Sequence, residues 1–184
     1  NLIEMGQGRL EGKVAVITGG TSGIGLDSVR LFVAEGARVV FCGRGAAAGQ
    51  RIAQECGGDA ACVFVAADVT DDEQLKAVID TAVARWGQLD VLFNNAGGGG
   101  FPFPGVAQGT AGQAMRFLEL NFRPVVTAIA HAAPHLAKRP TASIINNSSI
   151  AALRPGFGEA PYAAAKAAVD AYGRAAGLAT ATAT

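Results

Sequence analysis

The sequence predicts an α/β fold, in which a parallel β-sheet is covered by helices on both faces. Short apolar runs, such as Val14-Ala-Val-Ile17, alternate along the chain with longer amphipathic segments. The apolar runs are continuous, which is typical of strands that are buried on both sides. Helices between such strands form right-handed crossovers, so we expect parallel strands with a ligand at their carboxyl ends.

Each apolar run is expected to be one strand and each amphipathic segment one helix. The strands are expected at residues 14–18, 38–42, 62–66, 89–93 and 143–146, in the sheet order 3-2-1-4-5. The helices are expected at residues 23–35, between the second strand and residue 57, at 70–85, from the end of a Gly- and Pro-rich loop (97–109) to residue 137, and at 160–179. The third helix is expected to begin with a capping box of Thr70 and Glu73.

Composition limits the classes of function. With 184 residues, of which 50% are hydrophobic and 16% charged, we expect one domain over residues 1–184. Fifteen basic and fifteen acidic residues cancel, so no nucleic-acid partner is expected. No apolar run approaches the roughly 20 residues of a membrane span, and the first residues lack the apolar core of a secretory signal. Neither a membrane location nor export is therefore expected.

Cysteine and histidine residues give no metal-binding pattern. Cys42, Cys56 and Cys62 are an odd number without metal-ligand spacing, which indicates a reducing compartment, the cytoplasm. His131 and His135 have the spacing of a metal pair on a helix, but no third ligand is evident. We therefore expect no metal site.

A glycine-rich loop follows the first strand and leads into the first helix. It reads Thr18-Gly-Gly-Thr-Ser-Gly-Ile-Gly25. Small residues here let the backbone turn tightly and approach a pyrophosphate, whose charge meets the N-terminus of the helix. Glycines also mark ordinary turns, but between a strand and a helix they favour dinucleotide binding.

A second group of residues has the chemistry of proton transfer. Tyr162 and Lys166 are four residues apart on a predicted helix, so their side chains share one face. A neighbouring ammonium group favours the phenolate form of a tyrosine, which makes Tyr162 a candidate general acid and base. Ser149, at the carboxyl end of the fifth strand, is placed to donate a hydrogen bond to a reacting oxygen. Tyr162 alone would be a structural helix tyrosine, but the set favours catalysis.

Four segments, in this order, resemble the short-chain dehydrogenase/reductase family. They are the G-x-x-x-G-x-G loop, Asn94-Asn-Ala-Gly97, Asn121, and Ser149 ahead of Tyr162-Ala-Ala-Ala-Lys166. The resemblance implies a Rossmann-like doubly wound sheet and an oxidoreductase that uses a nicotinamide cofactor. It further implies that Tyr162 exchanges the alcohol proton and Lys166 also binds the nicotinamide ribose. Ser149 would orient the carbonyl group, and Asn121 would support a proton relay.

The resemblance also implies which residues bind the cofactor. These are Gly19, Thr21, Ser22, Gly23, Ile24, Gly25, Arg44, Asp68, Val69, Asn95, Ala96, Gly97, Tyr162 and Lys166. Asp68 matches an aspartate that contacts adenine, with loop capping as its alternative role. The second strand ends in Gly43-Arg44 without a carboxylate, which favours NADP, because a guanidinium group binds a 2′-phosphate. NAD is the alternative, since Gly-Arg also occurs in NAD users of the family.

Two residues beside these motifs are unusual. Pro124 leaves the carbonyl of Leu120 without its usual amide partner, so a helix distortion is expected next to Asn121. The distortion is either part of the site or a plain kink. Asn147 is polar where the family commonly has an aliphatic residue, which puts local packing in question.

The resemblance leaves two functions open. Family members usually continue with a sixth strand, a substrate-binding region and a seventh strand, so these strands are expected to be missing and the chain incomplete at its C-terminus. The chain is either an oxidoreductase that interconverts a secondary alcohol and a ketone, or a truncated module that binds a dinucleotide without turnover. Expected partners are a small-molecule alcohol or ketone and further copies of the chain, as a homo-oligomer (dimer or tetramer). An open edge on the fifth strand would also promote association.

Overall fold

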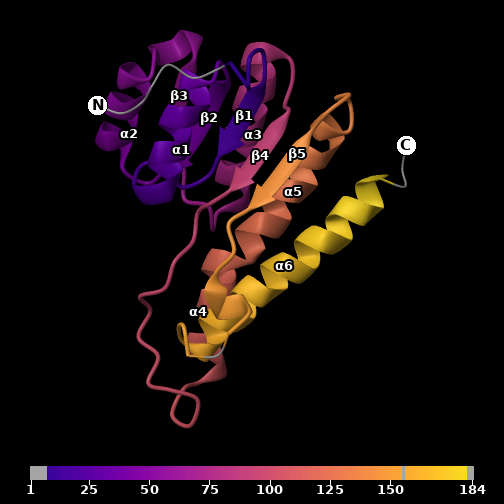
Figure 1. Ribbon diagram of the computed structural model, residues 1–184. Coiled ribbons are helices and arrows are strands. Elements are labelled where there is room, and N and C mark those ends of the chain that lie inside the picture. Colours follow the sequence, from indigo (N-terminus) through magenta and orange to yellow (C-terminus); the bar gives the residue numbers. More distant parts are fainter. Residues whose placement is uncertain (1–7, 155, 182–184) are drawn as a thin grey trace.

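The computed structural model describes residues 8–154 and 156–181, with side chains up to residue 177. Its centre is a parallel sheet in the order β3-β2-β1-β4-β5, as the sequence predicts (Figure 1). The strands are β1 (Val14–Ile17), β2 (Arg38–Gly43), β3 (Cys62–Ala66), β4 (Val91–Asn94) and β5 (Ser143–Asn146). In this described part of the chain, β3 and β5 are the edges of the sheet, and no sixth or seventh strand is present.

Helices cover both faces of the sheet. They are α1 (Gly23–Ala34), α2 (Ala46–Glu55), α3 (Asp72–Trp86), α4 (Ala111–Asn121), α5 (Arg123–Leu136) and α6 (Ala160–Ala181), with short 3-10 turns η1 (Gly58–Ala60) and η2 (Ile150–Ala152). Ala15 and Ile17 of β1 share a core with α1 and α2, whereas Val14 and Val16 share one with α3 and α5. Both faces of β1 are therefore buried, which explains its continuously apolar sequence, whereas the edge strand β5 is only partly covered and leaves Ile145 41% exposed.

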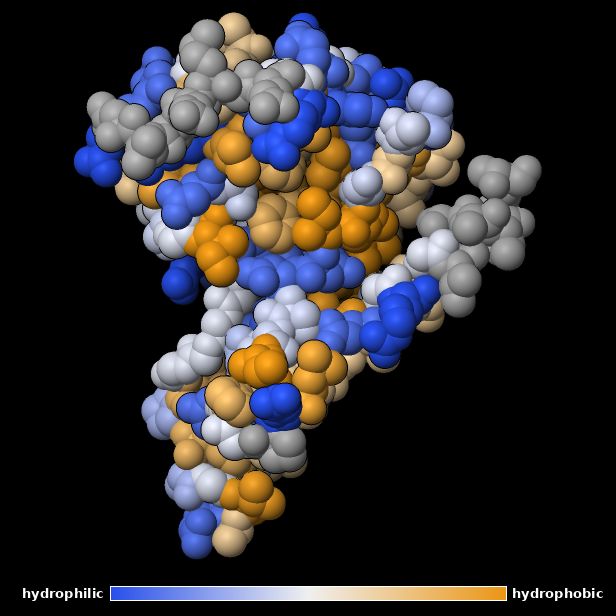
Figure 2. All heavy atoms as spheres, viewed as in Figure 1, coloured by the Kyte–Doolittle hydropathy of each residue, from blue (hydrophilic) through white to orange (hydrophobic). Residues whose placement is uncertain are grey.

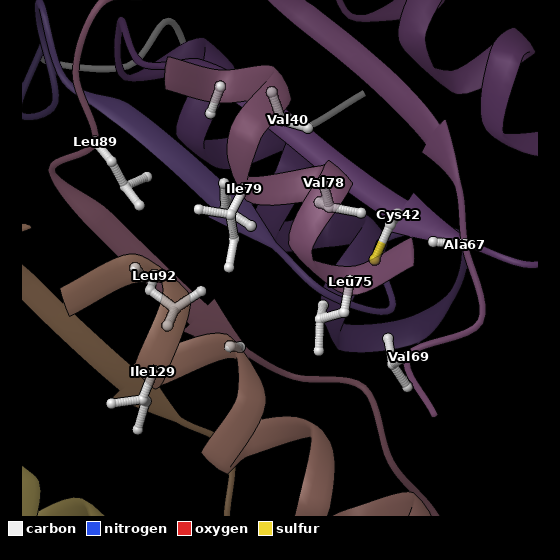
Figure 3. Packing of buried hydrophobic residues seen from close by; sticks show 14 of the residues in the cluster. Val40, Cys42, Ala67, Val69, Leu75, Val78, Ile79, Leu89, Leu92 and Ile129 are labelled. Atoms are coloured by element: carbon white, nitrogen blue, oxygen red, sulfur yellow. The ribbon is translucent and has the colours of Figure 1, made fainter. Parts of the chain in front are cut away.

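The larger core lies between the sheet and the helices α3 and α5. Leu75 and Ile79 of α3 and Leu92 of β4 are fully buried, and Ile129 of α5 packs with them (Figure 3). Burial of each such side chain contributes about 1.5–3 kcal/mol to folding. This packing fixes the strands and therefore the relative positions of their carboxyl ends.

A buried carboxylate joins the amino ends of β1 and β4. Asp90 is 1% exposed and accepts hydrogen bonds from the Val14 amide (2.9 Å), Gln88 Nε2 (2.8 Å) and Arg139 Nε (2.8 Å). Burial alone would raise the pKa of Asp90, but the bonds from the Val14 amide and Arg139 outweigh it and hold that pKa below the usual range. The carboxylate therefore stays ionised while it holds the two strands in register.

The predicted start of the third helix is wrong by one residue. The N-cap of α3 is Asp71, whose Oδ1 accepts from the amides of Glu73 and Gln74 at 3.0 Å each. A carboxylate at this position caps the amides and also interacts favourably with the helix dipole. Thr70 instead donates its hydroxyl group to Asp68 Oδ1 at 2.7 Å.

The predicted long helix is interrupted beside Asn121. It consists of α4 and α5, which are separated at Phe122, and Pro124 lies in the first turn of α5. The Val125 amide donates to the carbonyl of Phe122, three residues back, at 3.0 Å. Because residue 124 has no amide proton, the helix ladder cannot continue through this point. The expected distortion at Pro124 is thus confirmed, and it makes Asn121 the last residue of α4.

A lobe extends beyond the carboxyl ends of the strands. It contains α4, the loop before it and the start of α6 (Figure 1). The rings of Phe101 and Phe103 both meet Phe117 edge to face, with centroids 5.2 and 6.2 Å apart, and Phe117 is fully buried. These contacts hold the glycine- and proline-rich loop against α4. None of the described helices has both the length and the apolar character needed to cross a membrane.

Candidate functional site

A cleft of about 840 Å³ lies at the carboxyl ends of the strands. At this level a band of hydrophilic residues crosses the molecule, between the hydrophobic strands and the lobe (Figure 2). Eleven of the predicted cofactor-binding residues line the cleft: Gly19, Thr21, Ser22, Ile24, Gly25, Arg44, Asp68, Val69, Asn95, Ala96 and Gly97. Gly23, Tyr162 and Lys166 are not in its wall. The volume is within the range typical of small-molecule sites.

The glycine loop is shaped so that no side chain occupies its concave side. Gly19 has a φ of 68°, and a Cβ atom there would lie 2.9 Å from Ala96 Cα. A Cβ atom on Gly25 would lie 2.1 Å from the carbonyl oxygen of Gly19 and 2.5 Å from Asn95 Nδ2. Both approaches are closer than any real contact, so the turn requires glycine at these positions.

The N-terminus of α1 opens onto this loop. Ser22 is its N-cap residue, yet its side chain makes no capping hydrogen bond. The amides of the first turn therefore remain available, and the helix dipole favours an anion beside them. Together with the loop, they fit the pyrophosphate of a dinucleotide.

A polar junction joins the ends of three strands. Thr18 Oγ1 accepts from the amides of Asn95 and Ala96 at 3.0 Å each. Asn95 Nδ2 donates to the carbonyls of Thr18 (3.1 Å) and Gly19 (3.2 Å), and Asn95 Oδ1 accepts from Asn147 Nδ2 (3.0 Å). The junction thereby links the ends of β1, β4 and β5.

Arg44 and Asp68 mark the end of the cleft near β2 and β3. Hydrogen bonds from the Thr70 amide (2.9 Å) and hydroxyl group (2.7 Å) hold the pKa of Asp68 below its usual range, and the nearby Arg44 charge adds to this. Asp68 thus caps its own loop, the alternative role, while it also lines the cleft. Arg44 is exposed at the cleft wall and is free to meet an anion.

Asn121, Tyr162 and Lys166 lie together beyond the β5 end of the cleft. Lys166 is 4% exposed, donates from Nζ to the carbonyl of Asn147 at 2.8 Å, and lies 5.9 Å from the centre of the Tyr162 ring. Burial lowers the pKa of Lys166, and the charge of Asp170 partly opposes this. A Cβ atom on Gly97 would lie 2.7 Å from Asn121 Oδ1 and 3.2 Å from Lys166 Nζ, so both side chains lie directly behind Gly97, which itself lines the cleft.

Asn121 also shapes the loop after β4. It is 1% exposed, donates from Nδ2 to the carbonyls of Gly98 and Phe117 at 2.9 Å each, and accepts from the Gly98 amide at 2.8 Å. These bonds satisfy the side-chain amide and fix the path of the loop. The Asn121 side chain therefore connects α4 to the Gly97-Gly98 segment.

Ser149 is less closely joined to this group. Its Oγ accepts from the Ala151 amide at 3.2 Å and caps η2. Among the described residues, no hydrogen bond joins Ser149 to Tyr162. The two segments meet at Gly158, where a Cβ atom would lie 3.1 Å from Tyr162 Cδ1 and 3.7 Å from Ala151 Cβ.

Several cleft residues were not predicted from the sequence. Arg116, Glu119 and Leu120 of α4, Arg123 at the start of α5 and Asn147 after β5 also line the cleft. Asn147 stood out in the sequence only as a packing question, but its amide is hydrogen-bonded. In the described part of the chain, no three His, Cys, Asp or Glu side chains are grouped as metal ligands.

Comparisons with known proteins agree with this geometry. A family model described as short chain dehydrogenase matches residues 13–183. Momilactone A synthase of Oryza sativa subsp. japonica is 40% identical over 86% of this chain and 57% of that protein. (+)-Borneol dehydrogenase 2 of Salvia officinalis is 37% identical over 88% and 57%, and L-fucose dehydrogenase of Rattus norvegicus is 41% identical over 93% and 62%. The chain spans about three fifths of the length of these relatives.

Replacing Gly25 by Ala tests the shape of the loop. The added methyl group meets the Gly19 carbonyl and Asn95, so the loop must open, and we expect dinucleotide affinity to fall at least about tenfold. Gly112→Ala is the matched control, because a Cβ atom on Gly112 has no neighbour within 4 Å. Calorimetric titration with NADPH measures both variants. Equal affinities for Gly25→Ala and the wild-type chain would contradict the assignment of the loop.

Proposed function

Because this chain belongs to the short-chain dehydrogenase/reductase family, we propose that it carries the cofactor site and the proton-transfer residues of an oxidoreductase acting on a secondary alcohol or ketone. The observation that carries the proposal is the buried Lys166 ammonium group beside the Tyr162 ring. A positive charge at this position favours phenolate and so helps Tyr162 to exchange a proton. The glycine loop and the cleft supply the place for the nicotinamide dinucleotide.

The bound nicotinamide group would donate or accept the hydride, and the residues of the chain would handle the proton. Tyr162 gives its hydroxyl proton to the carbonyl oxygen during reduction and takes it back during oxidation. Lys166 stabilises the phenolate left behind, and the Asn147 carbonyl holds its ammonium group in place at 2.8 Å.

The hydroxyl group of Ser149 is free to donate a hydrogen bond to a substrate. Its oxygen accepts from the Ala151 amide, which leaves its own O–H group free to donate. A substrate carbonyl oxygen between Ser149 and Tyr162 would then receive two hydrogen bonds, which stabilise the charge that develops on it. Asn121 holds the Gly97-Gly98 segment in place through its bonds to Gly98.

A binding module without turnover is the second candidate. The observation that favours it is that none of Ser149, Tyr162 and Lys166 lines the cleft, so the dinucleotide half of the site is formed more completely than the substrate half. Both candidates share the cofactor site. They differ in whether a ketone is held next to Tyr162.

We propose NADP as the cofactor, with NAD as the alternative. Arg44 is exposed at the cleft wall near the end of β2, where dinucleotide folds distinguish a 2′-hydroxyl from a 2′-phosphate group. The end of β2, Gly43-Arg44, carries no carboxylate, and Asp68 already accepts hydrogen bonds from Thr70. A guanidinium group that is not committed elsewhere suits the phosphate.

Tyr162→Phe tests the proton-transfer role. The change keeps the ring and its packing but removes the hydroxyl group, so kcat should fall by about a hundredfold or more. NADPH affinity should fall by much less than kcat, because Lys166 and the glycine loop are unchanged. Tyr172→Phe is the control. Tyr172 lies on α6, ten residues after Tyr162, and its ring packs against Phe122. Steady-state rates with a panel of secondary alcohols provide the measurement, and near-normal kcat in Tyr162→Phe would refute the role.

Arg44→Ala tests the cofactor preference. Loss of a charge-assisted hydrogen bond is worth about 1.5–3 kcal/mol, so NADP affinity should fall about tenfold or more while NAD affinity changes little. Arg51→Ala serves as control, because Arg51 pairs with Glu55 on the exposed side of α2. Calorimetric titration with both cofactors gives the ratio. Equal losses for NADP and NAD, or a native preference for NAD, would reverse the assignment.

A further inference from the structure

Asn147 stands between the two halves of the site. Its side-chain Nδ2 donates to Asn95 Oδ1 at 3.0 Å, and Asn95 in turn holds the carbonyls of the glycine loop. Its main-chain carbonyl accepts from Lys166 Nζ at 2.8 Å. One residue therefore contacts both the partner of the glycine loop and the lysine beside Tyr162. A side chain that is aliphatic at this position could make only the second contact.

The hydrogen-bond network fixes the orientation of the Asn147 amide. Asn95 uses Nδ2 to donate to two carbonyls, so its Oδ1 is the end that faces Asn147. An oxygen accepts only from a donor, so Asn147 must present Nδ2 to Asn95. The Oδ1 atom of Asn147 then points away from this bond.

That oxygen is available to a ligand. Asn147 lines the cleft, and in the described part of the chain its Oδ1 accepts no hydrogen bond. Asn147 Oδ1 is also accessible to solvent. Among the described residues, the buried side-chain polar atom without a hydrogen-bond partner is Ser148 Oγ, so an unpaired Asn147 Oδ1 is not buried. An amide oxygen at the cleft surface is a strong acceptor that water satisfies until a ligand donor replaces it.

The position of Asn147 in the sheet indicates which half of a bound dinucleotide would contact it. Arg44 and Asp68 lie near the ends of β2 and β3, whereas Asn147 follows β5 at the other side of the sheet. Tyr162 and Lys166 are also on the β5 side, and the reacting ring must lie near them for hydride and proton transfer to act on one carbon–oxygen bond. A dinucleotide that spans this edge therefore places its nicotinamide riboside half next to Asn147.

We propose that Asn147 is a cofactor-binding residue whose Oδ1 accepts a hydrogen bond from a hydroxyl or amide donor of the nicotinamide riboside half. This inference rests on the proposed function, because it requires a nicotinamide dinucleotide in the cleft. It assigns to Asn147 a contact that an aliphatic side chain cannot make. The bond to Asn95 holds the acceptor in position before the cofactor arrives, which lowers the entropy cost of binding.

Two ligands separate a direct contact from a structural effect. NADPH contains the nicotinamide riboside, and adenosine 2′,5′-bisphosphate contains only the adenosine end. Asn147→Leu keeps the approximate side-chain volume and removes the acceptor, so NADPH affinity should fall about three- to tenfold while affinity for the bisphosphate stays within about twofold. Calorimetric titration of the intact chain measures both, and thermal melting checks that the variant is folded.

Two further variants control for folding and for loop damage. Asn146→Leu makes the same change one residue earlier, where the side chain accepts from Asn94 and faces Gly173 of α6 instead of the cleft, so both affinities should be unchanged. Asn147→Asp keeps an acceptor but loses the donor to Asn95, so any loosening of the loop weakens both ligands while their affinity ratio stays near that of the wild type. This variant keeps the test decisive if Asn147→Leu is unstable.

The outcomes distinguish this inference from the function on which it rests. Equal weakening of both ligands by Asn147→Leu, or no weakening of NADPH, would overturn the direct contact and leave the proposed cofactor site intact. Failure of the wild-type chain to bind either ligand would overturn the proposed function, and this inference with it. Selective loss of NADPH affinity, restored in ratio by Asn147→Asp, is the result that we expect.

Discussion

The site depends on the hydrogen bonds that join the carboxyl ends of β1, β4 and β5. The Thr18 hydroxyl oxygen accepts hydrogen bonds from two backbone amides of the segment after β4. The Asn95 side chain donates hydrogen bonds to two backbone carbonyls after β1. Polar groups that are this deeply placed must find partners, because an unsatisfied one costs about 1–3 kcal/mol. The strands can therefore meet in only one register, and the glycine loop and Lys166 are both attached to that register.

The chemistry follows from what is buried and what is left open around this junction. Lys166 is almost completely buried, but its ammonium group has a carbonyl partner and a nearby phenol ring, so its charge is tolerated and directed. The glycine loop is the opposite case, since backbone amides there are left without side-chain partners. We therefore propose that the glycine loop attracts a phosphate group and that Lys166 lowers the cost of moving a proton at Tyr162.

The sequence predicted the features that depend on local patterns. Continuous apolar runs predicted the strands, because a strand that is buried on both faces, such as β1, needs an apolar residue at each position. The alternation of strands with helices, together with the position of the glycine loop, predicted their parallel order. The start of α3 was missed by one residue, since Thr70 and Asp71 are both good capping residues and only the folded loop shows that Thr70 is used by Asp68. Pro124 predicted the distortion next to Asn121, because a proline has no amide proton and therefore interrupts the backbone hydrogen bonds of any helix.

The sequence could not predict the features that depend on distant pairs. Asn95 and Asn147 are 52 residues apart, and their hydrogen bond requires the register of β4 against β5. The α4 residues in the cleft wall are likewise placed by the break at Phe122, whose direction no local pattern specifies. The hydrogen bond by which the Ser149 oxygen caps η2 also depends on the folded loop, because no local pattern specifies it.

Hydride transfer itself is the most direct test of whether this site performs oxidoreductase chemistry. The chain should be incubated with NADPH that carries deuterium at its transferable position and with a panel of cyclic and acyclic ketones, and the alcohol products should be analysed by mass spectrometry. Our account predicts deuterium on the carbinol carbon of at least one product, with one face of the carbonyl preferred. NADPH that binds in the cleft while no product carries the label would contradict it and would leave a dinucleotide-binding module.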